Sequence, residues 1–483
     1  MQVISKEYVE KELARYRTPG MGVGVIKDGE VLFAGGFGYK DLETKEPIDA
    51  DTMWGIASCS KSFTATLIGM LVDDGVLDFD RPVKDYLPDF KMYDPFATAE
   101  CTLRDMLCHR TGLASYDAVW SDVTIEDREE LWQRLQYLKP NLPFRYKAQY
   151  NNYMVDIAAH VAEKVTGLKW DDMVEDRIFK PLGMTRSSTL VKYLDECENV
   201  CSSYWPGPGG PFKVPHWNSD VSAPAGGINS TVSDMLKYLD FHLKRGVLPD
   251  GTRLMQEETM RDLHMQNVRY TLWPWRFKEV SPIGGYAMGW YNDNYRGEPM
   301  YWHLGEIEGF GTLQCCLPNS QLGIILYNNL QCPDILIQCS VLYTIIDNVL
   351  GFEPVDWSER MWSVKDIKGN MHGDWKLDLL GDEFVAGTQP SHDLADYVGV
   401  YAEPGHGQLE IDLAGDKLLM TWRGVTQEIL HHHYDVFHIP EVKMDTLLVN
   451  APIYFHTDVK GDICGFGFKL YDEVGPIEFE RIG

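Results

Sequence analysis

Residues 20–41, GMGVGVIKDGEVLFAGGFGYKD, contain two β-strand patterns on either side of a turn at Lys27-Asp28-Gly29. Residues 100–245 have mostly helical patterns, with loops rich in Gly, Pro and Trp. Strand patterns then return in three segments: 284–293 (GGYAMGWYND), 300–318 (MYWHLGEIEGFGTLQCCLP) and 322–329 (LGIILYNN). Because strand pairs lie at both ends of a helical region, the sequence predicts an α/β (α+β) domain with one sheet built from both ends and a helical insertion.

The last quarter of the chain has a different pattern. Residues 356–390 are polar and rich in Gly and Asp, with weak helical patterning, and are interpreted as a linker. From about residue 391, short alternating strands recur roughly every eight to twelve residues, which predicts a small antiparallel barrel or sandwich. We therefore expect a first domain at 1–355, a linker at 356–390 and a β-barrel domain at 391–483.

The composition excludes several classes of protein. The 483 residues are 44% hydrophobic and 24% charged, with a formal net charge of −28, which argues against nucleic acid or an anionic membrane as the main partner. The N-terminal segment has no basic start followed by an apolar core, and no apolar run approaches the ~20 residues that span a bilayer. We expect a cytoplasmic protein whose ten scattered cysteines are reduced thiols.

A serine and a lysine three residues apart form the first candidate for chemistry. In the segment 56–64, IASCSKSFT, Ser58 and Lys61 lie between a short apolar approach and a strongly apolar helix pattern. Side chains three apart share one face of a helix, and a lysine held neutral by burial can take the proton of a serine hydroxyl. A helix start also offers free backbone N–H groups for an oxyanion.

Two further segments supply candidate partners for that serine. Tyr150 and Asn152 lie just before the apolar helix pattern in AQYNNYMVDIAAHVAEKVTG (148–167). His303 heads the strand pattern YWHLGEIEGFGT (301–312), where glycines such as Gly305 allow a backbone to approach a ligand closely. Taken singly, a tyrosine or a histidine in such a place is more often structural than catalytic.

Together, Ser58-x-x-Lys61, Tyr150-x-Asn152 and His303-x-Gly305 resemble the three-motif signature of the penicillin-recognising serine hydrolases. This group includes class C β-lactamases, DD-peptidases, esterases and D-aminopeptidases. The segments 102–113 (TLRDMLCHRTGL) and 224–239 (PAGGINSTVSDMLKYL) also resemble the group, so the likeness covers about residues 5–350. It implies an antiparallel sheet flanked by helices with a helical subdomain. A C-terminal lipocalin-like barrel resembles those of the D-aminopeptidase and peptidase branch.

The resemblance also implies a role for each motif in proton transfer. Ser58 attacks a carbonyl and becomes acylated. Lys61 and Tyr150 together deprotonate Ser58, and Tyr150 returns the proton to the leaving group. A single proton-transfer group of this kind contributes ~10²–10⁴-fold to the rate.

The remaining motif residues are implied to bind the substrate. Asn152 orients the substrate amide and Lys61, and His303 contacts the substrate near the tyrosine. The oxyanion lies between the backbone N–H of Ser58 and that of Glu306, which follows Gly305. True β-lactamases have a lysine where this chain has His303, and a neutral histidine attracts a substrate carboxylate less strongly.

We therefore predict a serine hydrolase that acts through an acyl-enzyme on a small amide or short peptide, as a peptidase or amidase tolerant of D-residues. The alternatives are an esterase or transacylase of the same fold, a weak β-lactamase, or a catalytically silent binding protein. No motif implies a cofactor or a metal. The chain has neither Gly-x-Ser-x-Gly nor His-Glu-x-x-His, which disfavours an α/β-hydrolase and a zinc protease. We expect no nucleic-acid or membrane partner, and assembly into a homo-oligomer through the barrel stays open.

Overall fold

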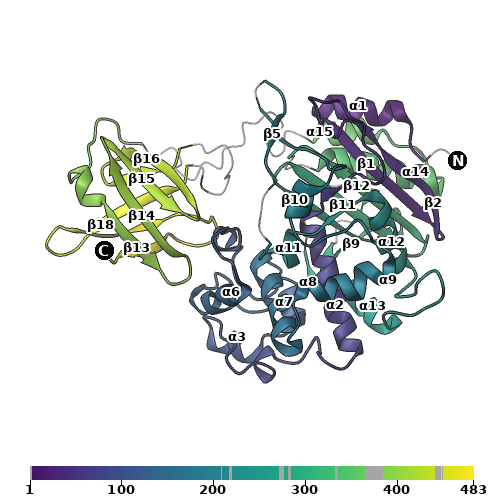
Figure 1. The fold of residues 1–483 in the computed structure, drawn as a ribbon, viewed down its shortest axis with the longest axis horizontal. Coiled ribbons are helices and arrows are strands. Elements are labelled where there is room, and N and C mark those ends of the chain that lie inside the picture. Colours follow the sequence, from purple (N-terminus) through teal and green to yellow (C-terminus); the bar gives the residue numbers. More distant parts are fainter. Residues whose placement is uncertain are drawn as a thin grey trace.

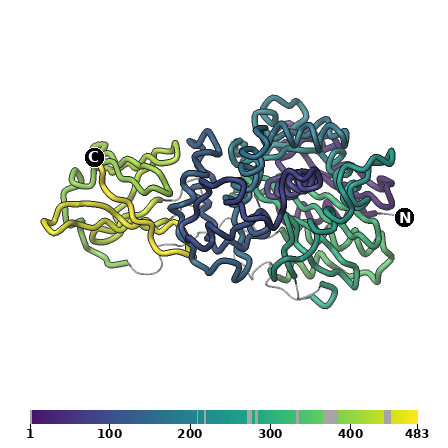
Figure 2. Tube along the Cα trace, turned by 90° about the horizontal axis from the view of Figure 1, so that it is seen from below, coloured from purple at the N-terminus to yellow at the C-terminus, as the bar shows by residue number. Residues whose placement is uncertain are grey.

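The computed structural model describes residues 3–207, 209–216, 220–270, 277–280, 284–331, 335–364, 384–440, 448 and 450–483. A sheet with its covering helices, a group of helices and a β-barrel follow one another along the long axis of the molecule (Figure 1). The middle group contains α3 (Pro95–Glu100), α6 (Arg128–Arg134) and α7 (Asn152–Thr166). The view from below shows the same order, with the C-terminal barrel at the end away from the N-terminus (Figure 2).

The sheet is antiparallel and has eight strands in the order β2-β1-β12-β11-β10-β9-β8-β7. Its strands are β1 (Gly20–Lys27), β2 (Glu30–Gly38), β7 (Val268–Arg269), β8 (Gly285–Tyr286), β9 (Tyr291–Tyr295), β10 (Glu298–Ile307), β11 (Phe310–Leu317) and β12 (Leu322–Asn328). The N-terminal hairpin joins the later strands through β1 and β12, where Gly24 pairs with Ile325. The predicted sheet built from both ends of the domain is confirmed.

Helices cover both faces of this sheet because its strand residues alternate between two buried layers. Val23 and Val25 pack with α1 (Lys6–Tyr16), α14 (Leu336–Leu350) and α15 (Trp357–Ser363). On the opposite face, α12 (Val232–Leu243) lies so close to β1 that a Cβ on Gly24 would be 2.7 Å from the side chain of Val232. Glycine at this position therefore allows the helix to contact the sheet directly.

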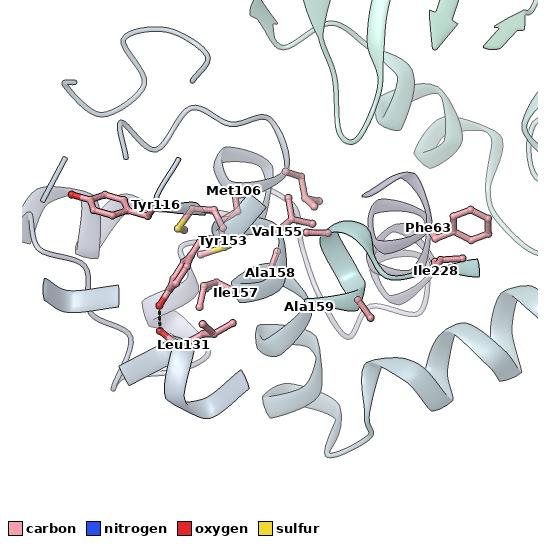
Figure 3. Packing of buried hydrophobic residues seen from close by; sticks show 14 of the residues in the cluster. Phe63, Met106, Tyr116, Leu131, Tyr153, Val155, Ile157, Ala158, Ala159 and Ile228 are labelled. Atoms are coloured by element: carbon pink, nitrogen blue, oxygen red, sulfur yellow. Dashed lines mark hydrogen bonds between the residues drawn. The ribbon is translucent and has the colours of Figure 1, made fainter. Parts of the chain in front are cut away.

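The predicted helical insertion lies between β2 and β7. Its longest helices are α2 (Ser60–Asp73), α7 and α12, and residues 60–71 of α2 are all buried. The shorter helices are α4 (Leu103–Leu107), α5 (Asp117–Trp120), α8 (Trp170–Val174), α9 (Lys180–Leu182), α10 (Lys192–Glu196), α11 (Ala223–Gly226) and α13 (Glu257–His264). Figure 3 shows the core around α7, where the Tyr153 hydroxyl donates a hydrogen bond to the carbonyl of Leu131.

The C-terminal strands form a closed antiparallel barrel in the order β13 to β20, in agreement with the predicted barrel. The strands are β13 (Gly399–Glu403), β14 (Gly407–Ala414), β15 (Lys417–Trp422), β16 (Val425–His433), β17 (Val436–His438), β18 (Pro452–Thr457), β19 (Ile463–Phe468) and β20 (Ile477–Arg481). Aromatic side chains fill its centre, for example Tyr401 beside Phe466 and Phe466 stacked on Phe479. Closure leaves no free sheet edge in the barrel.

The segment expected as a linker, 356–390, has two different parts. Its start forms α15, and Ser358 of this helix accepts a hydrogen bond from Arg15 of α1 at 3.0 Å. Residues 365–383 lie outside the described residues. No helix among the described residues combines the length and the apolar character needed to cross a bilayer.

Candidate active site

Ser58 lies in a tight turn that leads directly into α2. The turn is a 3₁₀ helix, Ala57–Cys59, that follows the short strand β3 (Trp54–Gly55). Ala57 has φ +48°, a left-handed conformation that costs a non-glycine residue ~1–3 kcal/mol and persists only where the surrounding structure imposes it. Lys61 follows in the first turn of α2, fully buried, with its Nζ 3.0 Å from Ser58 Oγ. The structure therefore brings the predicted nucleophile and base into contact.

The burial of Lys61 prepares it to act as a base. Desolvation lowers the pKa of Lys61 to about 7, although the negative charges of Asp156 and Asp117 oppose this shift. Its Nζ is positioned by the carbonyl of Ala225, which lies 2.6 Å away. A large fraction of the amine is thus neutral near pH 7, and a neutral amine can accept the proton of Ser58.

Tyr150 approaches the same serine from the start of α7. Its hydroxyl lies near the side chain of Ser58, which acts to lower the pKa of the phenol, and its ring centroid lies 5.0 Å from Lys61 Nζ. Burial raises the pKa of Tyr150 well above its usual value, so the side chain is a phenol rather than a phenolate in the resting site. Tyr150 is therefore suited to donate a proton, while Lys61 is suited to accept one.

Asn151, between the two motif residues, fixes the start of α7. It is fully buried, and its side chain caps the helix by accepting from the backbone N–H of Met154 at 2.8 Å. Its backbone N–H donates to Nδ1 of His109 at 3.2 Å, and its side-chain amide donates to the carbonyl of Ala114. These bonds hold Tyr150 on one side of Asn151 and Asn152 on the other.

Gly305 lets β10 approach the nucleophile turn. A Cβ at this position would lie 2.3 Å from the Ile56 carbonyl oxygen and 3.0 Å from the Ser58 backbone nitrogen, so a larger residue does not fit. Beyond Trp302, the described part of β10 pairs with β11 alone. This arrangement suits the predicted oxyanion site, which uses the backbone N–H groups of Ser58 and Glu306.

His303 lies beneath this site, and both of its ring nitrogens are bonded to protein groups. Nδ1 lies 2.5 Å from the carbonyl oxygen of Leu304 and carries the proton, while Nε2 accepts from the Tyr286 hydroxyl at 2.8 Å. Burial and the nearby Lys61 lower the pKa of His303 to about 3. The ring is therefore neutral and fully buried, with its centroid 6.2 Å from that of Tyr150.

Two carboxylates near Lys61 were not among the predicted site residues. Asp117 Oδ1 accepts from Asn152 Nδ2 at 2.9 Å. Asp156 Oδ1 accepts from the backbone N–H of Ala225 at 3.1 Å, and the carbonyl of that same residue receives Lys61. Burial raises the pKa of Asp156 to about 7. Asp156 could have been found from the sequence, because it is an acidic residue within the apolar helix pattern of residues 153–161. No comparable pattern surrounds Asp117.

Among the described residues, no group of three or more His, Cys, Asp or Glu side chains is placed to hold a metal ion. The site instead combines a serine, a buried amine, a phenol and the backbone N–H of Ser58, which lies close to Gly305 of β10. These are groups that a serine hydrolase uses.

Comparison with known proteins gives the family. Residues 6–334 match the family model described as Beta-lactamase, and the chain belongs to this family of serine hydrolases. Residues 384–481, which include the barrel, match a model described as a domain of unknown function, DUF3471.

Relatives and solved structures extend this result. The chain is 26% identical over 450 residues to a protein named unguisins hydrolase ungD from Aspergillus violaceofuscus, a match that covers 86% of this chain and 77% of the relative. The octameric penicillin-binding protein homologue from Pyrococcus abyssi is similar with a TM-score of 0.61 at 21% identity, covering 98% of this chain and 99% of that chain. A class C β-lactamase from Rhodobacter sphaeroides gives a TM-score of 0.58 at 21% identity, covering 71% and 99%. These two structural likenesses show the fold.

Proposed function

We propose that this protein hydrolyses a small amide or short peptide through an acyl-enzyme on Ser58, as a peptidase or amidase tolerant of D-residues. The observation that carries the proposal is the 3.0 Å approach of Lys61 Nζ to Ser58 Oγ, with the pKa of this lysine lowered to about 7. The D-residue tolerance rests on the resemblance to the D-aminopeptidase branch. The relative from Aspergillus violaceofuscus, named as a hydrolase of unguisins, supports a hydrolytic reaction.

Acylation begins with neutral Lys61. Its Nζ takes the proton of Ser58 while Oγ forms a bond to the substrate carbonyl carbon. The carbonyl oxygen becomes an oxyanion that accepts from the N–H groups of Ser58 and Glu306, and one such donor is worth ~10²–10³-fold in rate. Tyr150 donates its phenol proton to the leaving nitrogen as the C–N bond breaks, and then recovers a proton from the Lys61 ammonium.

Deacylation reverses the proton transfers with water as the nucleophile. Neutral Lys61, with Tyr150 as the relay, takes a proton from a water that attacks the ester carbon of the acyl-enzyme. The bond from carbon to Ser58 Oγ then breaks, and the serine oxygen regains its proton. The acid product leaves and the resting site is restored.

The charges around the site favour an amide or peptide substrate over a β-lactam. His303 is neutral, whereas Asp117 and Asp156 lie near Lys61, so a substrate carboxylate meets no fixed positive charge among the described site residues. An esterase remains the second candidate, because an ester needs less help from Tyr150 for departure of its leaving group.

The decisive experiment compares the wild-type protein with Ser58→Ala. A fluorophosphonate probe should label the wild type at Ser58, as mapped by mass spectrometry, and should not label the variant. Turnover of D- and L-amino-acid anilides and of p-nitrophenyl esters should fall by ~10⁴-fold or more in Ser58→Ala. Full turnover in this variant would refute the proposal, and a panel in which esters alone are cleaved would favour the esterase.

A further inference from the structure

The barrel packs against the short helix that holds Asn152. That helix is α5, one turn long, and its first residue Asp117 accepts the hydrogen bond from Asn152 Nδ2. A single helical turn has too few internal hydrogen bonds to be stable by itself. Tyr116, directly before it, has φ +50°, a strained conformation for a non-glycine residue. The position of Asp117 therefore depends on what surrounds α5.

One support comes from Arg423, in the turn between β15 and β16. Its guanidinium donates to the carbonyl oxygen of Ser121 at 2.9 Å and also to the hydroxyl of that serine. The Ser121 hydroxyl in turn donates to the backbone carbonyl of Asp117 at 2.6 Å. Arg423 thus binds Ser121 at the end of α5, and Ser121 is bonded to Asp117 at the beginning of the helix. Burial raises the pKa of the Asp117 carboxyl, and the positive charge of Arg423 is among the groups that oppose this shift.

A second support comes from Tyr471, which follows β19 of the barrel. Its ring packs edge-on against Tyr116, with the centroids 5.1 Å apart, and its hydroxyl lies near the backbone N–H of Ala118, which acts to lower the pKa of that hydroxyl. Nε2 of His406 lies 3.2 Å from the same hydroxyl, and Nδ1 of His406 lies 2.6 Å from Glu403. Both Tyr471 and His406 are buried, so the barrel presents a fixed polar surface to α5.

The amide of Asn152 has one orientation in this arrangement. Nδ2 faces the Asp117 carboxylate, which accepts hydrogen bonds, while Oδ1 is buried and has no hydrogen-bond partner among the described residues. A shift of Asp117 would release the amide to rotate, because nothing described holds its other end. The second hydrogen on Nδ2 remains available for a substrate carbonyl next to the scissile bond.

We infer that Arg423 and Tyr471 of the barrel are positioning residues for Asn152, which they hold through α5 and Asp117. The barrel thereby sets how well the site recognises an amide on the acyl side of its substrate. This inference rests on the proposed function, since Asn152 matters only if Ser58 is acylated by a substrate.

The test compares two esters that differ on the acyl side. p-Nitrophenyl N-acetylglycinate carries an amide there, and p-nitrophenyl acetate does not. In Arg423→Gln and Tyr471→Phe, kcat/KM for the first ester should fall by ~10-fold, the size of one lost hydrogen bond, while kcat/KM for the second stays within about 2-fold. Arg423→Lys should restore part of the loss. Lys417→Gln, which removes an exposed cation from the other end of β15, should match the wild type.

A double-mutant cycle tests the connection through α5. If Arg423 acts through Asp117, then Arg423→Gln should add little to the loss caused by Asp117→Ala. Equal losses with both esters, or additive effects in the cycle, would overturn the inference. Fluorophosphonate labelling of Ser58 distinguishes a failure of the proposed function from a failure of the proposed role of the barrel. A wild type that takes up no probe contradicts the proposed function, whereas normal labelling with unchanged ester selectivity in both barrel variants contradicts the role of the barrel alone.

Discussion

The two sides of the site are built in different ways. The nucleophile side consists of the turn at 57–61 and residues 303–306 of β10, which meet where Gly305 approaches the backbone of Ser58. The α7 side brings together Tyr150, Asn152 and Asp156 of one helix region with α5 and the barrel. The acidic groups that act on Lys61, Asp117 and Asp156, lie on the α7 side, and neutral His303 lies on the other. The comparison teaches that steric fit organises one side and buried charge organises the other.

Changing Lys61 should have the largest effect, because this amine belongs to the nucleophile side but is tuned by the α7 side. Lys61→Met should lower kcat/KM and the rate of fluorophosphonate labelling by ~10²–10⁴-fold. The exposed Lys147→Met provides the control. A loss of less than about 10-fold would mean that another group deprotonates Ser58.

The stability of the same variant checks the state of the amine. The pKa of Lys61 is lowered in the folded protein, so the unfolded chain binds more protons between about pH 7 and its usual value of 10.5. Wild-type stability in urea should therefore rise across this pH range by more than that of Lys61→Met.

Gly305→Ala tests the steric side. The new Cβ would displace either β10 or the turn that carries Ser58, and we expect a loss of ~10²–10³-fold in kcat as the oxyanion donors separate. Gly35→Ala, in β2 of the same sheet, meets nothing nearer than 3.6 Å and serves as the control. Normal kcat in Gly305→Ala would show that the close backbone approach has no part in the chemistry.

Asp156→Asn tests the charged side through the pH profile. The Asp156 carboxylate raises the pKa of Lys61, so its removal should move the acid limb of kcat/KM to lower pH by ~1 unit. Groups that also face Lys61, namely Asp117, Cys59, His109 and His303, remain in place. An unchanged acid limb would show that Asp156 does not act on the base.

The same variant should also change stability in a pH-dependent way. The pKa of Asp156 is raised to about 7 in the folded protein, so wild-type stability falls as the pH rises from about 4 to 7. Asp156→Asn lacks this loss and should resist urea better than the wild type at pH 8, with the difference disappearing near pH 4.

Tyr286→Phe should have the smallest effect on activity. It leaves Nε2 of His303 buried without a donor, at a cost of ~1–3 kcal/mol in unfolding free energy. Because burial keeps the ring neutral, kcat/KM should change by less than about 10-fold. The exposed Tyr146→Phe is the control for both measurements. A larger loss of activity with normal stability would give His303 a direct part in the reaction.

The sequence predicts those parts of the site whose residues lie close together along the chain. Ser58 and Lys61 are one helical turn apart, and Gly305 lies in a single short strand segment with His303. The sheet was also predictable, because a strand pattern at each end of a helical region has few ways to pair. Asp117 could not be found in this way, because its partner Asn152 and its supports Arg423 and Tyr471 come from distant segments. A contact between residues of distant segments leaves no periodic pattern in any one of those segments.

The pairing of Gly24 with Ile325 has a consequence for how the molecule is made. On the ribosome, the first hairpin emerges long before β12, the strand that pairs with it. The edge of β1 therefore stays unpaired while the helices are synthesised. Such long-range pairing raises the contact order and slows folding. The site around Ser58 is likewise incomplete until β10 (Glu298–Ile307) has been synthesised. We therefore expect the nascent chain to be inactive until β10 and β12 have joined the sheet.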